Sequence, residues 1–181
     1  AWRFEGNERK YLEEVLATGF RAGEDGAFTT RLEKNFANKY EVNYGITFNS
    51  GTSTLHAALL AMGCASGDEI LTPALTPLMC GLGPYYTGAT PVYIDSLSDT
   101  FLMDPVDIEK KITDKTKVIL VTHMYGAVCD MKSIMEIASK HKLMVLEDCA
   151  QCHMGRTYTG KLAGTIGDAG SWSFENSKQI T

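Results

Sequence analysis

Short apolar segments that alternate with helical segments are the feature that most constrains the fold of this chain. Residues 117–122 (KVILVT) and 143–147 (LMVLE) have the length and composition of buried strands, and a helical segment separates them. Such alternation is typical of βαβ units, in which helices join parallel strands. We therefore predict an α/β fold of three layers, with a mostly parallel sheet and helices on both faces. Ligands of such sheets bind beyond the carboxyl ends of the strands, so candidate site residues should follow strands.

The same pattern extends along the chain. Hydrophobic spacing and stop signals predict helices at residues 5–19, from residue 30 onward, and at 52–62, 78–86, 105–112 and 131–141. Strands are predicted at 44–49, 69–72, 90–95, 117–122, 143–147 and 170–174. Thr30 and Glu33 have the spacing of a capping box, which marks the start of the second helix. A glycine-rich loop is expected at 23–26.

The composition is that of a globular protein with one domain. The chain has 181 residues, of which 44% are apolar, and a formal net charge of −5. Its acidic balance argues against nucleic acid as a partner. We expect no membrane span, since no apolar run approaches roughly 18 residues, and no signal peptide. The 5 cysteines are odd in number and irregularly spaced, so we expect reduced thiols and a cytoplasmic protein.

The first candidate site is the turn at residues 49–54 (NSGTST), between a predicted strand and a predicted helix. Gly51 permits a tight turn there, and hydroxyl residues surround the helix start. Free N–H groups and the helix dipole at such a start suit an anion such as phosphate. The alternative is ordinary capping of the helix by Ser50 or Thr52.

The second candidate site is the acidic pair Glu147 and Asp148, which follows the apolar residues of strand 143–147. Burying a carboxylate costs free energy unless it has partners. Asp148 could face a bound cation or a protonated heterocycle, or it could cap the next turn. The residues by themselves favour neither alternative.

The same segment contains the Cys-x-x-Cys-His pattern of c-type haem attachment at 149–153. The pattern fixes only three residues, and nothing else in the chain indicates the secreted history of a haem protein. A redox pair is disfavoured because the thiols follow a buried strand, and zinc would need two further ligands. We expect Cys149 and Cys152 to be small buried apolar residues, and we expect no metal site.

The third candidate site is Lys178, a few residues after the predicted strand 170–174. Ser173 and Ser177 offer contacts for an anion nearby, although a lone lysine is ordinarily exposed. His123 follows strand 117–122. It could stack on a ligand or catalyse, but a hydrogen-bonded core histidine is the commoner role.

Six segments, in this order and spacing, resemble one known family. They are SGTSTLHAALLAMG (50–63), GDEILTPALT (67–76), GATPVYID (88–95), THMYG (122–126), EDCAQ (147–151) and SFENSK (173–178). Together they are similar to the DegT/DnrJ/EryC1/StrS sugar aminotransferases, which have the type I fold of enzymes that use pyridoxal 5′-phosphate (PLP). The resemblance covers nearly the whole chain.

The resemblance implies a role for each candidate residue. PLP needs a lysine for a Schiff base, an acid at its pyridine nitrogen and a site for its phosphate. Lys178 matches the Schiff-base lysine, which also serves as general base, and Asp148 matches the acid at the nitrogen. The other cofactor-binding positions implied by the family are Gly51, Thr52, Ser53 and Ser173 around the phosphate, and Gln151 at the phenolic oxygen of the ring.

The sequence also departs from the family pattern. Pro77 stands where the family often has an aromatic residue that stacks on the ring, so stacking must come from elsewhere or be weaker. Ser53 replaces a more usual alanine. Some relatives carry histidine in place of the lysine and are sugar dehydratases, so Lys178 favours amino transfer over dehydration.

Family members are about twice as long as this chain. Residues 1–181 are therefore expected to be the N-terminal segment and most of the PLP-binding large domain, without the C-terminal small domain. The family's active site forms between two subunits, which implies a homodimer.

The activity implied by the resemblance is PLP-dependent transfer of an amino group. A small-molecule donor, glutamate, would supply the group, and a keto sugar linked to a nucleotide would accept it. Synthesis of cell-surface polysaccharide or of antibiotic sugars is the implied pathway. The alternative is a regulatory or non-transaminating relative of the same fold that binds PLP.

Overall fold

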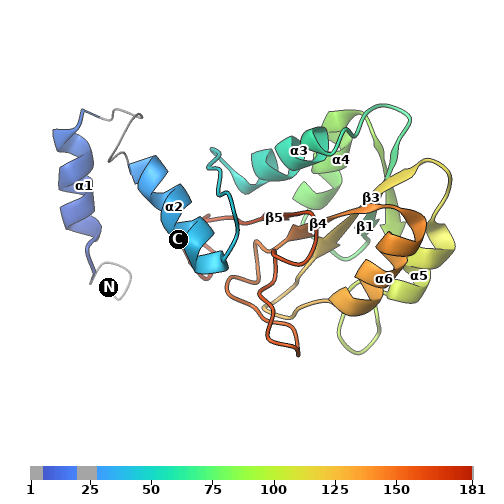
Figure 1. Cartoon of the computed structure of the whole chain (residues 1–181). Helices are drawn as coiled ribbons and strands as arrows, with labels where there is room; N and C mark the ends of the chain where they lie inside the picture. The colour runs from blue at the N-terminus through green and yellow to red at the C-terminus, as the bar shows by residue number, and fades with distance from the viewer. Residues whose placement is uncertain (1–5, 20–27, 181) are drawn as a thin grey trace. The chain divides into compact units, whose positions relative to one another are not determined.

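The computed structural model describes residues 6–19 and 28–180 of the chain (Figure 1). The chain divides into two compact units, one that extends to Thr47 and one that begins at Phe48. The glycine-rich loop predicted at 23–26 lies outside the described residues. None of the helices in the described part of the chain has the length and apolar character needed to cross a membrane.

The described residues of the first unit form two helices, α1 (Glu8–Ala17) and α2 (Phe28–Tyr40). The rings of Tyr11 and Phe28 meet edge to face, with their centroids 5.6 Å apart. The guanidinium of Arg31 lies over both rings and also forms an ion pair of 3.2 Å with Glu14. Aromatic and charged contacts therefore join the two helices.

Two predictions about this unit are wrong. Helix α2 begins before Thr30, and the Glu33 carboxylate accepts hydrogen bonds from the backbone N–H and the hydroxyl of Thr47, each at 2.8 Å, so no capping box forms. Residues 44–49, predicted as a strand, form no strand and lie outside the sheet. Tyr44 and Ile46 in this segment are exposed, so its alternating pattern has no core to face.

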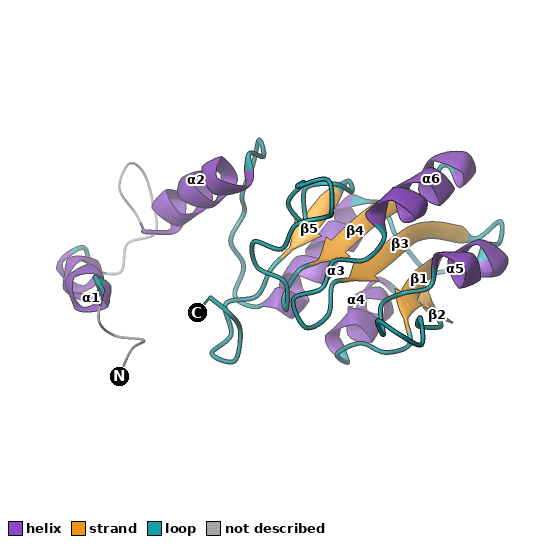
Figure 2. Cartoon of the chain, turned by 90° about the horizontal axis from the view of Figure 1, so that it is seen from below, coloured by secondary structure: helices purple, strands orange, loops and turns teal. Residues whose placement is uncertain are grey.

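The second unit is built on a sheet of 5 strands, all of which pair in parallel in the order β2-β1-β3-β4-β5 (Figure 2). The strands are β1 (Glu69–Pro73), β2 (Thr90–Ile94), β3 (Thr116–Thr122), β4 (Met144–Asp148) and β5 (Ala169–Ser171). The helices are α3 (Gly51–Ala61), α4 (Met79–Thr87), α5 (Pro105–Lys111) and α6 (Met131–His141). These elements match the predicted ones closely, except that β5 ends three residues before the predicted boundary.

Both faces of the sheet are covered, because successive residues of a strand point to opposite faces. Val118 and Leu120 of β3 join a core with Leu55 and Leu59 of α3. Ile119 of β3 faces the other way, into a core with the buried residues of α5 and α6. Figure 1 shows α3 and α4 on one side of the sheet and α5 and α6 on the other. The predicted three-layer α/β fold is thus confirmed.

Candidate functional site

The candidate site lies at the carboxyl edge of the parallel sheet. Because the strands share one direction, the residues that end β3, β4 and β5 meet along one edge. Asp148 ends β4 and pairs in register with Thr122 at the end of β3 and with Ser171 at the end of β5. Ser173 and Lys178 follow β5, and α3 begins beside Ser173.

The start of α3 lies against Ser173. A methyl group placed on Gly51 would come within 3.0 Å of the Ser173 Cβ and 3.3 Å of its hydroxyl oxygen, so only glycine fits here without displacement. The side chains of Thr54 and Ser171 share a hydrogen bond of 2.5 Å, which links the helix to β5. The turn at residues 49–54 and the segment that carries Ser173, both predicted to bind phosphate, are therefore neighbours.

Ser50 caps α3, as the capping alternative predicts. Its hydroxyl accepts the backbone N–H of Ser53 at 3.2 Å, and the Ser53 hydroxyl in turn donates to the Asn49 side chain at 2.7 Å. Capping uses one of the N–H groups of the first turn. The N–H groups of Gly51 and Thr52 belong to the same turn, where the helix itself offers no acceptor. Capping and anion binding are thus compatible at this helix start.

Asp148 is a buried carboxylate that accepts two hydrogen bonds. Its side chain is almost inaccessible, with an exposed fraction of 5%. Oδ1 accepts the backbone N–H of Ala150 at 2.9 Å, and Oδ2 accepts the Cys80 thiol at 3.0 Å.

Opposing influences act on the ionisation of Asp148. Burial raises the pKa of its carboxyl. The hydrogen bonds from Cys80 and Ala150 pull the pKa in the other direction, but burial prevails. The positive charge of Lys178 also lowers this pKa, which places the Lys178 amine within electrostatic reach of the carboxylate.

The segment that carries Lys178 is fastened to the turn after β4. The side-chain amide of Gln179 donates to the backbone carbonyl of Gln151 at 2.7 Å. Its oxygen lies 3.1 Å from Nδ1 of His153, so that ring nitrogen carries the donated proton. Lys178 itself is half-buried, and its backbone N–H donates to the Glu175 carbonyl at 2.9 Å. These contacts hold the lysine at the edge that Asp148 occupies.

Gln151 joins two loops at this edge. Its side-chain oxygen accepts the backbone N–H of Tyr125 at 3.3 Å, and its carbonyl accepts that of Gly126 at 2.8 Å. The Gln151 side chain therefore faces the loop after β3.

Glu147, next to Asp148, is a structural carboxylate. Oε2 accepts a hydrogen bond from His123 at 2.9 Å and from the N–H of Gly164 at 2.8 Å. Oε1 accepts the N–H groups of Ile166 and Gly167, each at 2.7 Å. Burial alone would raise the pKa of Glu147, but these hydrogen bonds outweigh it and lower the pKa.

His123, Glu147 and Cys149 lie close enough together to suggest a metal site. Nδ1 of His123 accepts the backbone N–H of Cys129 at 3.2 Å, so Nε2 carries the proton donated to Glu147. Burial raises the pKa of the Cys149 thiol. The imidazole of His123 and the carboxylate of Glu147 are thus engaged in hydrogen bonds within the protein. These bonds indicate a structural role for the three side chains and not a metal site. His123 is a buried, hydrogen-bonded core histidine, and this prediction is confirmed.

Cys149 and Cys152 are free thiols, fully buried in a small core with Ala163. Burial raises the pKa of both thiols. Buried, protonated thiols do not suit haem attachment or redox exchange. The prediction that both act as small apolar residues is confirmed.

Cys80 and Thr122 belong to the site but were not predicted from the sequence. The Thr122 hydroxyl donates to the Cys80 sulfur at 3.3 Å, and Cys80 donates to Asp148. Cys80 lies in α4, 68 positions before Asp148 in the chain. Its place on the buried face of a helix is the only sequence signal it gives, and that signal is shared by many core residues.

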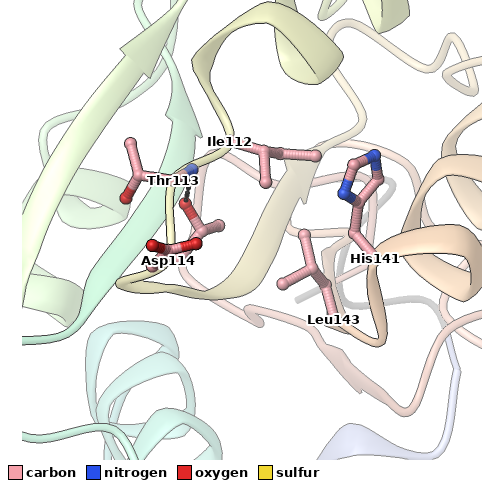
Figure 3. A pocket seen from close by; sticks show the side chains of 6 residues that line it. Ile112, Thr113, Asp114, His141 and Leu143 are labelled. Carbon is pink, nitrogen blue, oxygen red and sulfur yellow. Dashed lines mark hydrogen bonds between the residues drawn. The ribbon is translucent and has the colours of Figure 1, made fainter.

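A separate hollow of about 480 Å³ lies at the opposite edge of the sheet (Figure 3). Thr113 and Asp114, which precede β3, line one side, and His141 and Leu143, which precede β4, line the other. The hollow therefore opens at the amino ends of the strands, away from Asp148 and Lys178.

The family can now be established. The model of the DegT/DnrJ/EryC1/StrS aminotransferase family matches residues 3–181. The chain belongs to this family. Among curated members, GDP-perosamine synthase of Escherichia coli O157:H7 is 43% identical over 176 residues, which are 97% of this chain and 48% of that protein. The chain thus spans about half the length of the curated DegT/DnrJ/EryC1/StrS relatives it matches.

Solved structures of similar proteins have the same fold. An aminotransferase from Psychrobacter cryohalolentis matches 98% of this chain and 45% of its own, with a TM-score of 0.92 and 37% identity. NtdA from Bacillus subtilis, solved with the bound cofactor pyridoxamine phosphate (PMP), matches 86% of this chain and 35% of its own, with a TM-score of 0.77 and 37% identity. The family resemblance seen in the sequence is confirmed.

Replacing Glu147 by glutamine tests its structural role. We expect Glu147→Gln to lower the free energy of unfolding by about 3 kcal/mol, because the new amide group faces backbone N–H groups that need an acceptor. A lowered pKa in the folded state means that the stabilisation is present above the ordinary value of 4.5 and is lost as the pH falls below it. The loss measured by chemical denaturation should therefore shrink in acid.

Glu109→Gln is the matched control. Glu109 is an exposed carboxylate paired with Lys140, so its replacement should leave stability nearly unchanged. Equal losses for the two variants, or a loss for Glu147→Gln that does not depend on pH, would contradict the structural role.

Proposed function

We propose that the protein containing this chain is a PLP-dependent aminotransferase. Glutamate would donate the amino group, and a keto sugar linked to a nucleotide would receive it. The observation that carries the proposal is that a buried acid, a lysine and the start of α3 lie at one sheet edge. The start of α3 would hold an anion. The sugar nucleotide is suggested by the name of GDP-perosamine synthase, which shares 43% identity. Curated relatives named as a synthase and a transaminase favour an enzyme over a relative that only binds PLP.

The residues present fit the cofactor. The contact of Gly51 with Ser173 leaves a cradle of backbone and hydroxyl groups in which phosphate would be held. Ser173 accepts the backbone N–H of Glu175 at 3.3 Å, so its own proton is free to be donated to an anion. Thr52 and Ser53 in the first turn of α3 would complete the phosphate site.

Asp148 would hold the pyridine nitrogen in its protonated form. When bound, PLP supplies an electron-withdrawing ring that stabilises negative charge on the neighbouring carbon. A carboxylate in a buried site acts strongly on a cation because little water screens it. Gln151 would lie beside the phenolic oxygen of the ring.

Lys178 would bind the cofactor covalently and then act as general base. Its Nζ would take a proton from Cα of the substrate and deliver it to C4′ of the cofactor. The hydrogen bonds of Gln179 to the turn at 151–153 limit the movement of the lysine segment, so Nζ would stay over the same edge.

The remaining features of the family complete the proposal. Residues 1–181 would form the N-terminal segment and most of the large domain, and the small domain would lie outside them. The active enzyme would be a cytoplasmic homodimer that serves polysaccharide or antibiotic sugar synthesis. Pro77 lines a hollow of about 450 Å³ with Thr76, Gly81 and Tyr93. Because proline has no aromatic ring, stacking on the cofactor ring would come from elsewhere or be weaker.

Lys178→Ala tests the covalent role of the lysine. We expect the whole protein to gain visible absorbance with PLP, and the variant to lose it because no amine is left to bond. Lys161→Ala, which removes an exposed lysine from a turn, should keep the absorbance. Borohydride reduction followed by peptide mapping should place the cofactor on Lys178, and its recovery on another lysine would overturn the assignment.

Asp148→Asn tests the role of the buried charge. Asparagine keeps the size of the side chain but not its negative charge, so PLP should remain bound while the half-reaction with glutamate slows by at least about 100-fold. The measurement is the rate of 2-oxoglutarate formation in a single turnover. Asp104→Asn, at the cap of α5, is the control and should react normally. A near-normal rate for Asp148→Asn would contradict the role.

A further inference from the structure

A line of hydrogen bonds runs from the surface of the second unit to Asp148. The Thr76 hydroxyl donates to the Thr122 hydroxyl at 3.2 Å, and the Thr122 hydroxyl donates to the Cys80 sulfur at 3.3 Å. The Cys80 thiol donates to Oδ2 of Asp148 at 3.0 Å. The line joins the loop after β1, the end of β3, helix α4 and the end of β4.

All three bonds have the same direction. A thiol carries one proton, so Cys80 can donate to Asp148 only if it accepts from Thr122 through its lone pairs. Burial and the nearby Asp148 charge raise the pKa of Cys80, which keeps the proton on the sulfur. The Asp148 oxygen at the end of the line is therefore always offered a donor.

We propose that Cys80 is a positioning residue of the active site: its thiol orients the Asp148 carboxylate and favours its ionised form. Both carboxylate oxygens then accept a proton donor from the protein, Oδ1 from Ala150 and Oδ2 from Cys80. A proton on Oδ2 would face the proton of the Cys80 thiol, and the hydrogen bond between them would be lost. The consequence for catalysis rests on the proposed function, whereas the effect on the carboxylate does not.

The contribution of Cys80 matters because burial works against the charge of Asp148. Three described side chains from neighbouring elements lie near the carboxylate: Cys80 from α4, His123 from the loop after β3, and Lys178 from the segment after β5. His123 is already committed to Glu147, and Lys178 would be engaged by the cofactor. Among the described residues, the Cys80 thiol donates its proton to Asp148 alone.

The experiment measures the ionisation of Asp148 without the cofactor. The pKa of its carboxyl is followed in the cofactor-free whole protein by the ¹³C chemical shift of the side-chain carbon, with Asp148→Asn to identify the signal. Cys80→Ala should raise this pKa by at least about one pH unit, a tenfold loss of ionisation. Cys80→Ser, which again donates a proton, should bring the pKa back towards that of the wild type.

Cys64→Ala is the matched control, because Cys64 is a buried thiol in the same core and lies apart from Asp148. It should leave the Asp148 pKa unchanged. If Cys80→Ala does not fold, Cys80→Val takes its place, since valine fills the space and donates no proton. A pKa for the Ala or Val variant equal to that of the wild type, or no recovery with serine, would overturn the proposal.

The pH profile of the half-reaction with glutamate gives the second reading. The acidic limb should move to higher pH in Cys80→Ala by the same interval as the Asp148 pKa, and it should stay in place in Cys64→Ala. An unmoved limb in a variant whose Asp148 pKa has risen would overturn the catalytic part of the proposal. A wild-type protein that does not bind PLP would refute the proposed function, yet the titration of Asp148 would still decide the role of Cys80.

Discussion

The burial of Asp148 at the end of β4 is the constraint on which the rest of the site depends. A carboxylate with an exposed fraction of 5% has lost most of its water, and the protein must replace that water with donors and positive charge. It does so from three directions, with the Cys80 thiol from α4, the Ala150 backbone from the following turn, and the charge of Lys178 from beyond β5. The replacement is incomplete, since burial still raises the pKa, and the remaining deficit is what a protonated heterocycle would supply. A positive group placed here would offset that deficit.

Glu147 and Asp148 show how adjacent residues of one strand come to have different roles. Consecutive side chains of a strand point to opposite faces, so the two carboxylates meet different surroundings. Glu147 accepts four hydrogen bonds, one from His123 and three from backbone N–H groups, and its pKa is lowered. Those bonds fix the turn that leads into β5. One carboxylate therefore builds the site, while the other faces it.

Much of this arrangement follows from the sequence, because it depends on local patterns. The strands and helices from residue 51 onward, the parallel sheet and the edge at which Asp148, Ser173 and Lys178 meet all derive from alternation and from strand direction. The errors arose where a tertiary contact replaced a local one. Glu33 binds Thr47 and not Thr30, and residues 44–49 alternate in character without a neighbouring strand. Cys80 could not be predicted because its contact with Asp148 spans 68 positions and follows no spacing rule.

In our proposal, a single sheet edge gathers the acid, the lysine and the anion site around PLP. A crystal structure of the whole protein grown with PLP tests it most directly. We expect electron density continuous with Nζ of Lys178, the ring nitrogen within hydrogen-bond distance of Asp148, and the phosphate at Gly51 and Ser173. PLP density at any other place on the protein, or a ring nitrogen that faces away from Asp148, would contradict it.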